Sequence, residues 1–175
     1  MQIIDEPLPN LLIIKPKVFK DKRGFFLETW RDDTYKKFGI NEVFLQENWS
    51  RSKYGVLRGL HFQLNHPQGK LVSVRSGKIF DVAVDLRKTS VTFGKWYGIE
   101  LSDKNHLQMY VPPGFAHGFC VLSKSADFVY KCSDYYRSGD ESGIIWSDED
   151  LNIDWPIKTP IISDKDRNLK KIIDL

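Results

Sequence analysis

Apolar and polar side chains alternate with a period of two along much of the chain. The clearest run is Ile79–Leu86, where Phe80 and every second residue after it are apolar. Asp81, Ala83 and Asp85 occupy the positions between them. Successive side chains of a β-strand point to opposite faces, so this run predicts a strand with one apolar face.

Similar short runs recur along the sequence and are separated by Gly, Pro, Asn and Asp. The predicted strands are Leu11–Ile14, Phe25–Trp30, Val43–Gln46, Gly59–Gln63, Leu71–Arg75, Tyr97–Glu100, Gln108–Val111 and Phe128–Cys132. Many short strands at close spacing are typical of a sandwich, barrel or jelly roll, so the chain is expected to be all-β.

Helical signals are few. A short helix is expected over Asp33–Phe38, opened by an Asp cap and closed by Gly39. A second is expected near Asp164–Lys171, with Ser163 as its cap. No strand is followed by a glycine-rich turn and a long amphipathic helix, which argues against a Rossmann nucleotide-binding unit.

Composition narrows the class of protein. The 175 residues contain no internal repeat or linker, so a single domain is expected over residues 1–175. The net charge of +3 is small for a nucleic-acid binder, and no apolar run is long enough to span a bilayer. The N-terminus carries no secretion signal, and Cys120 and Cys132 are expected to stay reduced. These features predict a cytoplasmic protein that binds neither nucleic acid nor a membrane.

Two histidines lie in runs that suggest chemistry. Alternation places His61 on one face of its strand, with Gly59 and Gln63, and Arg58 on the other face. Imidazole titrates near neutrality, so His61 is either a general base or a hydrogen-bonded core histidine. This strand alone leaves both interpretations open.

The second histidine ends the pattern Pro112-x-Gly114-x-x-His117, which resembles a sequence motif of the cupins. Cupins are small β-barrels or jelly rolls, and many bind a metal through His-x-His, a downstream Glu and a further His. Here the first pair reads His61-Phe62-Gln63, so the ligand set is incomplete and no metal is expected.

A run of basic and aromatic residues suggests a ligand. Arg23, Phe26 and Glu28 place a cation, an aromatic ring and a carboxylate within one turn and strand. A guanidinium suits a phosphate, a ring can stack on a base, and a carboxylate can accept from an imide. A solvated turn with a surface ion pair explains the same residues, and composition alone favours that simpler interpretation.

Several motifs, in order, resemble those of the dTDP-4-dehydrorhamnose 3,5-epimerase family over nearly the whole chain. They are Asp21-x-Arg23-Gly24-x-Phe26-x-Glu28, Gln46-Glu47-Asn48-x-Ser50, Arg58-Gly59-Leu60-His61-Phe62-Gln63, Gln68-x-Lys70, Asp81–Arg87, Pro112–Phe119, Tyr130-Lys131-x-x-x-Tyr135-Tyr136 and Ser163-Asp164-Lys165-Asp166. A series of motifs in the right order is far more specific than any one of them.

The resemblance implies a cupin-type jelly roll that works as a homodimer on a dTDP-sugar, without a metal or redox cofactor. The implied reaction converts dTDP-4-dehydro-6-deoxy-D-glucose to dTDP-4-dehydro-L-rhamnose by inverting C3 and C5. The implied catalytic residues are His61 as base, Asp166 behind it, Tyr130 as acid and Lys70 at the enolate oxygen. The implied substrate-binding residues are Arg23, Phe26, Glu28, Gln46, Asn48, Arg58, His117 and Tyr136.

Other functions remain in competition at this stage. A related enzyme could invert only one carbon or isomerise the keto group, depending on where the acid lies. A non-catalytic sugar-binding cupin would bind the ligand without exchanging protons. It offers no reason for His61, Lys70, Tyr130 and Asp166 to occur together.

Overall fold

A computed structural model describes residues 1–175, and most of its regular secondary structure is antiparallel β-sheet. The strands are β1 (Gln2–Leu8), β2 (Leu11–Lys15), β3 (Val18–Asp21), β4 (Gly24–Leu27), β5 (Gln46–Lys53), β6 (Leu57–Gln63), β7 (Lys70–Ser76), β8 (Lys78–Asp85), β9 (Trp96–Ser102), β10 (Gln108–Val111), β11 (Phe115–Val121), β12 (Ser125–Cys132) and β13 (Glu141–Gly143). The helices are α1 (Asp32–Lys36), α2 (Asp164–Arg167) and the 3₁₀ turn η1 (Ile172–Asp174).

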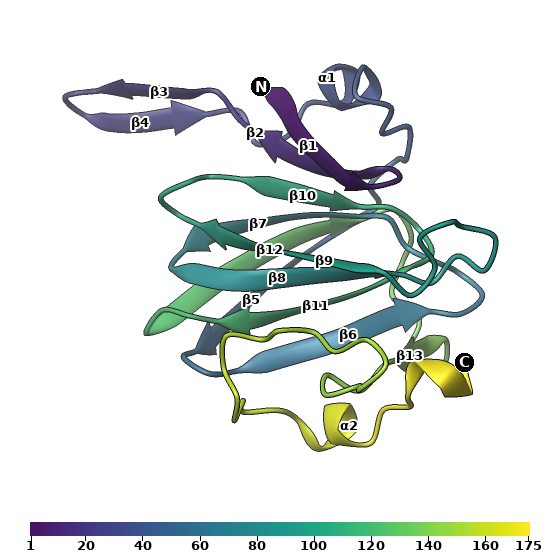
Figure 1. Ribbon diagram of the computed structural model, residues 1–175. Helices are drawn as coiled ribbons and strands as arrows, with labels where there is room; N and C mark the ends of the chain where they lie inside the picture. The colour runs from purple at the N-terminus through teal and green to yellow at the C-terminus, as the bar shows by residue number, and fades with distance from the viewer.

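Two antiparallel sheets pack face to face in a jelly roll. One has the strand order β1-β2-β10-β7-β12-β5 and the other β13-β6-β11-β8-β9. A separate hairpin, β3–β4, projects from the body at the upper left of Figure 1, and the C-terminal segment with α2 runs beneath β6. The all-β jelly roll with few short helices that the sequence predicts is confirmed.

Three apolar clusters hold these layers together. The largest lies between the two sheets and includes Ile79, Ala83, Phe119 and Phe128. A second cluster covers the outer face of the five-stranded sheet with residues of the C-terminal segment such as Trp155. β8 is therefore covered on both sides, and its acidic face, with Asp81 and Asp85, points into the protein rather than to solvent.

Strict alternation fails in β6, where the pairing with β11 shifts register between His117 and Phe119. Gly59 has φ +114°, and a Cβ there would lie 2.6 Å from the Cα of Gly118 on β11. The prediction that Arg58 and His61 face opposite ways is wrong. The irregularity turns both side chains into one cavity, because an extra residue in a strand reverses the faces that follow it.

Helix α1 also differs from its prediction. It begins at Asp32, with Arg31 as an N-cap residue that makes no side-chain capping bond. Asp33 cannot serve as the cap because its carboxylate accepts two hydrogen bonds from the Arg31 guanidinium, at 2.7 and 2.8 Å. Helix α2 does have the predicted cap, since Ser163 Oγ accepts from the backbone N–H of Asp166.

Candidate active site

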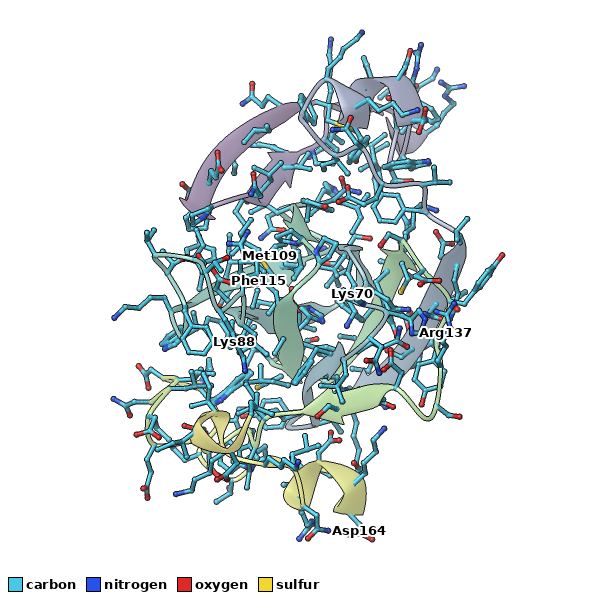
Figure 2. All side chains as sticks on the ribbon, turned by 90° about the vertical axis from the view of Figure 1, so that its right-hand side faces the viewer. Lys70, Lys88, Met109, Phe115, Arg137 and Asp164 are labelled. Carbon is cyan, nitrogen blue, oxygen red and sulfur yellow. The ribbon has the colours of Figure 1, made fainter.

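A cavity of about 520 Å³ opens between the two sheets, beside α2, and a second lobe of about 360 Å³ adjoins it. Four side chains line both lobes: His61, Lys70, Tyr130 and Lys165. Figure 2 shows Lys70 in the interior of the molecule, between the strands. Titratable groups thus converge where the two lobes meet, which is typical of an active site.

His61 is held by a carboxylate from the far end of the chain. Its Nε2 lies 2.8 Å from Oδ1 of Asp166, and Oδ2 of Asp166 accepts from the Gly59 N–H at 3.2 Å. Burial alone would raise the pKa of Asp166, but the hydrogen bonds from His61 and Gly59 outweigh it and lower that pKa. An ionised Asp166 orients the imidazole and stabilises it when it takes up a proton.

A second carboxylate approaches the other ring nitrogen of His61. Oε1 of Glu141, on β13, lies 3.8 Å from Nδ1 of His61. Oε2 of Glu141 accepts a hydrogen bond from the Lys165 ammonium and a second, at 2.7 Å, from the Tyr136 hydroxyl. The sequence gives no signal for Glu141, because its short strand has no apolar pattern and its partners are distant in sequence.

His117 and Asp81 form a second, buried histidine–carboxylate pair. Nε2 of His117 lies 3.0 Å from Oδ1 and 3.2 Å from Oδ2 of Asp81, and both side chains are buried. Burial raises the pKa of Asp81, against the opposing effects of His117 and Lys70. Asp81 was not among the predicted site residues, although the alternation of its strand had placed it on an acidic face.

Lys70 and Tyr130 supply groups that can act on negative charge and on protons. Burial lowers the pKa of Lys70 from that of an exposed lysine, although the charges of Glu141 and Asp81 act in the opposite direction. Burial also raises the pKa of Tyr130, which keeps its phenol protonated through the neutral range. The pair therefore offers an ammonium for a developing oxyanion and a proton donor.

The polar side chains predicted to bind a ligand divide between two places. Arg58 and His117 line the first lobe, and Gln46, Asn48 and Tyr136 line the second. The Tyr136 N–H donates to Oε1 of Gln46 at 3.0 Å, and Nε2 of Gln46 donates to Oδ1 of Asn48 at 2.9 Å. These bonds fix the wall of the second lobe.

Arg23, Phe26 and Glu28 are not part of this cavity. They lie on the β3–β4 hairpin and just after it, where Arg23 pairs only with Asp21 and the Phe26 side chain is 69% exposed. A hairpin with three exposed phenylalanines is unusual on a surface that faces only water. Within one chain the predicted ligand site is therefore incomplete.

The structure bears on metal ions, disulfides and membrane spans. No group of three or more His, Cys, Asp or Glu residues is placed so that it could hold a metal ion. Cys120 and Cys132 are both free and buried. No helix combines the length and the apolar character needed to cross a membrane.

Comparison with known proteins gives a consistent result. The sequence model of the family described as dTDP-4-dehydrorhamnose 3,5-epimerase matches residues 5–174. The protein of that name from Shigella flexneri is 51% identical over 176 residues, covering 99% of this chain and 97% of its own.

Solved structures agree. The epimerase of Legionella pneumophila in complex with dTDP-4-keto-L-rhamnose superposes with a TM-score of 0.96 at 49% identity, covering 98% of this chain and 93% of its own. A 3′-monoepimerase from Streptomyces bikiniensis in complex with dTDP-quinovose has a TM-score of 0.90 at 28% identity, covering 96% and 86%. The chain belongs to the dTDP-4-dehydrorhamnose 3,5-epimerase family and is an isomerase.

Proposed function

We propose that the chain epimerises dTDP-4-dehydro-6-deoxy-D-glucose at C3 and C5 to dTDP-4-dehydro-L-rhamnose, without a metal or redox cofactor. One observation carries the proposal: a histidine, paired with a carboxylate of α2, and a phenol lie on different sheets and line the same cavity. His61 belongs to the five-stranded sheet and Tyr130 to the six-stranded sheet. Inversion at carbon requires a base and an acid on opposite faces of the sugar.

Inversion at each carbon divides into two proton transfers. His61 removes the proton from the carbon beside the C4 ketone, and the electron pair of that C–H bond moves into the enolate. The proton is a weak acid, on the order of ten pKa units weaker than imidazolium, so the enolate must be stabilised. Lys70 supplies that stabilisation at the C4 oxygen. Tyr130 then donates its proton to the opposite face of the same carbon and recovers one from solvent, while His61 releases to solvent the proton that it took. The same two transfers at the second carbon complete the double inversion.

Asp166 and His117 support these steps without exchanging protons with the sugar. Asp166 holds the imidazole through Nε2, which leaves Nδ1 to receive the proton. His117, fixed by Asp81, lines the sugar pocket. Arg58, Gln46 and Asn48 bind the diphosphate and sugar hydroxyls, since a guanidinium and amides suit those oxygens.

We further propose that a second copy of the chain completes each site. Its β3–β4 hairpin would bring Arg23 to the diphosphate, and Phe26 and Glu28 to the thymidine end opposite Tyr136. The exposed rings of the hairpin and its distance from the chain's own cavity support this arrangement. In this proposal the protein is a cytoplasmic homodimer, and its substrate is a dTDP-sugar.

The experiment that tests the reaction is proton NMR of the substrate with chelator-treated enzyme in deuterium oxide. Deuterium at both C3 and C5, with formation of the L-rhamno product, is the expected result. Label at only one carbon would make the chain a mono-epimerase, like the Streptomyces bikiniensis relative. Absence of exchange would favour a sugar-binding protein, and activity that returns only with added metal would overturn the cofactor-free mechanism.

A further inference from the structure

Glu141 has a position that the proposed mechanism does not use. Its side chain is 12% exposed, and its two oxygens serve different partners. Oε1 lies 3.8 Å from Nδ1 of His61, and Oε2 binds Lys165 and the Tyr136 hydroxyl. The imidazole therefore lies between two carboxylates, Asp166 at Nε2 and Glu141 at Nδ1.

Glu141 is a charged neighbour of the base rather than a neutral one. Burial alone would raise its pKa, but the bonds from Lys165 and Tyr136 and the charge of His61 outweigh burial and lower it. Because Asp166 occupies Nε2, the proton taken from substrate arrives at Nδ1. The imidazolium so formed carries its new N–H on the side of Glu141.

Lys165 connects this carboxylate to the ligand site. Its side chain is 54% exposed and lines both lobes, whereas that of Glu141 is mostly buried, so the lysine is the freer partner of the two. A diphosphate entering the cavity would compete with Glu141 for the Lys165 ammonium. When Lys165 turns toward the phosphate, its ammonium neutralises Glu141 less, and the negative charge of Glu141 acts more strongly on His61.

We propose that Glu141 is a positioning residue that strengthens His61 as a base, and that Lys165 links this effect to occupation of the cavity by the diphosphate. The inference rests on the proposed role of His61. Glu141 itself takes no proton. Its charge favours the imidazolium, while the ammonium of Lys165 opposes it until the substrate draws the lysine away.

Other charged groups also face His61, and none forms the same bridge. The groups that line the cavity with it are Arg58 on its own strand, Lys70 on β7, His117 on β11, Tyr130 on β12, and Lys165 and Asp166 on α2. Of these groups only Lys165 pairs directly with Glu141, whose other partner, the neutral Tyr136 hydroxyl, lines the second lobe. Removing Glu141 should therefore weaken His61 as a base, and removing Lys165 should strengthen it.

The test compares the pH dependence of kcat/KM in E141Q and K165M. Loss of the carboxylate should move the acidic fall in activity of E141Q to lower pH, by up to about one unit. Its kcat should fall about tenfold, because the remaining base is weaker, with KM little changed. K165M should move the acidic fall to higher pH and raise KM. E141D should recover part of the lost kcat.

The surface pair Lys171–Glu149, 3.7 Å apart, supplies matched controls, and E149Q and K171M should leave the profile unchanged. Shifts of E141Q and K165M in the same direction, or an unshifted profile in E141Q, would overturn the inference. K165M carries the test alone if E141Q does not fold, since its lysine is half exposed. Wild-type enzyme that shows no turnover would instead refute the proposed function.

Discussion

Oδ1 of Asp166 lies 2.8 Å from Nε2 of His61, although the two residues are 105 positions apart in sequence. The pair joins the C-terminal helix α2 to strand β6, so the base is complete only when the last segment has folded against the sheet. The isolated bridges Val56–Ile161 and Ile144–Lys170 hold that segment in place.

Asp166→Asn should lower kcat by about 1,000-fold, because an amide keeps the shape of the side chain but cannot stabilise an imidazolium. Affinity for dTDP, measured by calorimetry, should stay near the wild-type value, since the partners of the carboxylate are His61 and the Gly59 N–H. A kcat within threefold of wild type would show that His61 does not depend on this carboxylate.

His61→Ala should abolish turnover and solvent exchange together. The variant loses the group proposed to remove the proton, so kcat should fall by about 1,000-fold or more. The measurement is deuterium incorporation by NMR, with dTDP binding as the control for folding. Normal epimerisation by this variant would remove His61 from the role of base.

Tyr130→Phe should separate the two halves of the reaction. Proton removal by His61 continues, so deuterium still enters the recovered substrate, while formation of the inverted product falls by about 100-fold or more. The phenyl ring keeps the packing of Phe128, whose ring centroid lies 5.3 Å from that of Tyr130. Equal loss of exchange and inversion would contradict the assignment of Tyr130 as the acid.

Lys70 should set the alkaline limit of activity. Burial lowers its pKa, and the useful species is the cation, so kcat/KM should fall as pH rises and do so below 10.5. Burial raises the pKa of Tyr130, which moves the loss of the phenol proton to higher pH. Lys70→Arg should move or remove this alkaline fall, because a guanidinium stays charged above pH 12. An unchanged alkaline limb in an active Lys70→Arg enzyme would assign it to another group.

Much of the fold follows from local pattern, and the failures have identifiable causes. The strand over Gln108–Val111 was predicted with its observed limits, because all four residues are buried and three of them are hydrophobic. The strand predicted over Val43–Gln46 is instead Gln46–Lys53. That strand has a polar cavity face on one side and an exposed face on the other, so no apolar alternation marks it.

The candidate site was also predictable only in part, because the polar residues of a cavity leave no apolar alternation in the sequence. His61, Lys70, Tyr130 and Asp166 were identified through a family resemblance, and the structure brings them to one cavity. Glu141 was not predicted as a site residue, because its importance depends on contacts with residues that are distant in the sequence. Arg58 was placed on the wrong face because the irregular pairing around Gly59 is invisible to a pattern of period two.

Asp85 should be a large contributor to stability, without touching the cavity. It is fully buried and accepts from the Arg87 guanidinium at 2.7 and 2.9 Å and from the Ser90 and Thr92 hydroxyls. Asp85→Asn should lower the free energy of unfolding by about 3 kcal/mol, because it leaves Arg87 without its anion. The measurement is the urea midpoint at unchanged m-value.

The pH dependence of that loss has a definite sign. Burial alone would raise the pKa of Asp85, but these hydrogen bonds lower it below its usual value. The stabilisation is thus present above the unfolded-state pKa and is lost as pH falls through the lower, folded-state value. The difference between wild type and Asp85→Asn should therefore shrink in acid, and a constant difference would contradict the assignment.

The most specific prediction about assembly concerns the β3–β4 hairpin. If each site combines one chain's cavity with its partner's hairpin, Arg23→Ala and His61→Ala impair different halves of a site. Mixing the two inactive variants with subunit exchange should restore about a quarter of wild-type activity, because half the dimers are mixed and each has one intact site. The control is the double variant mixed with wild type, which should also give about a quarter, since only wild-type dimers work. If both residues served the site of their own chain, the first mixture would stay inactive and the second would reach about half.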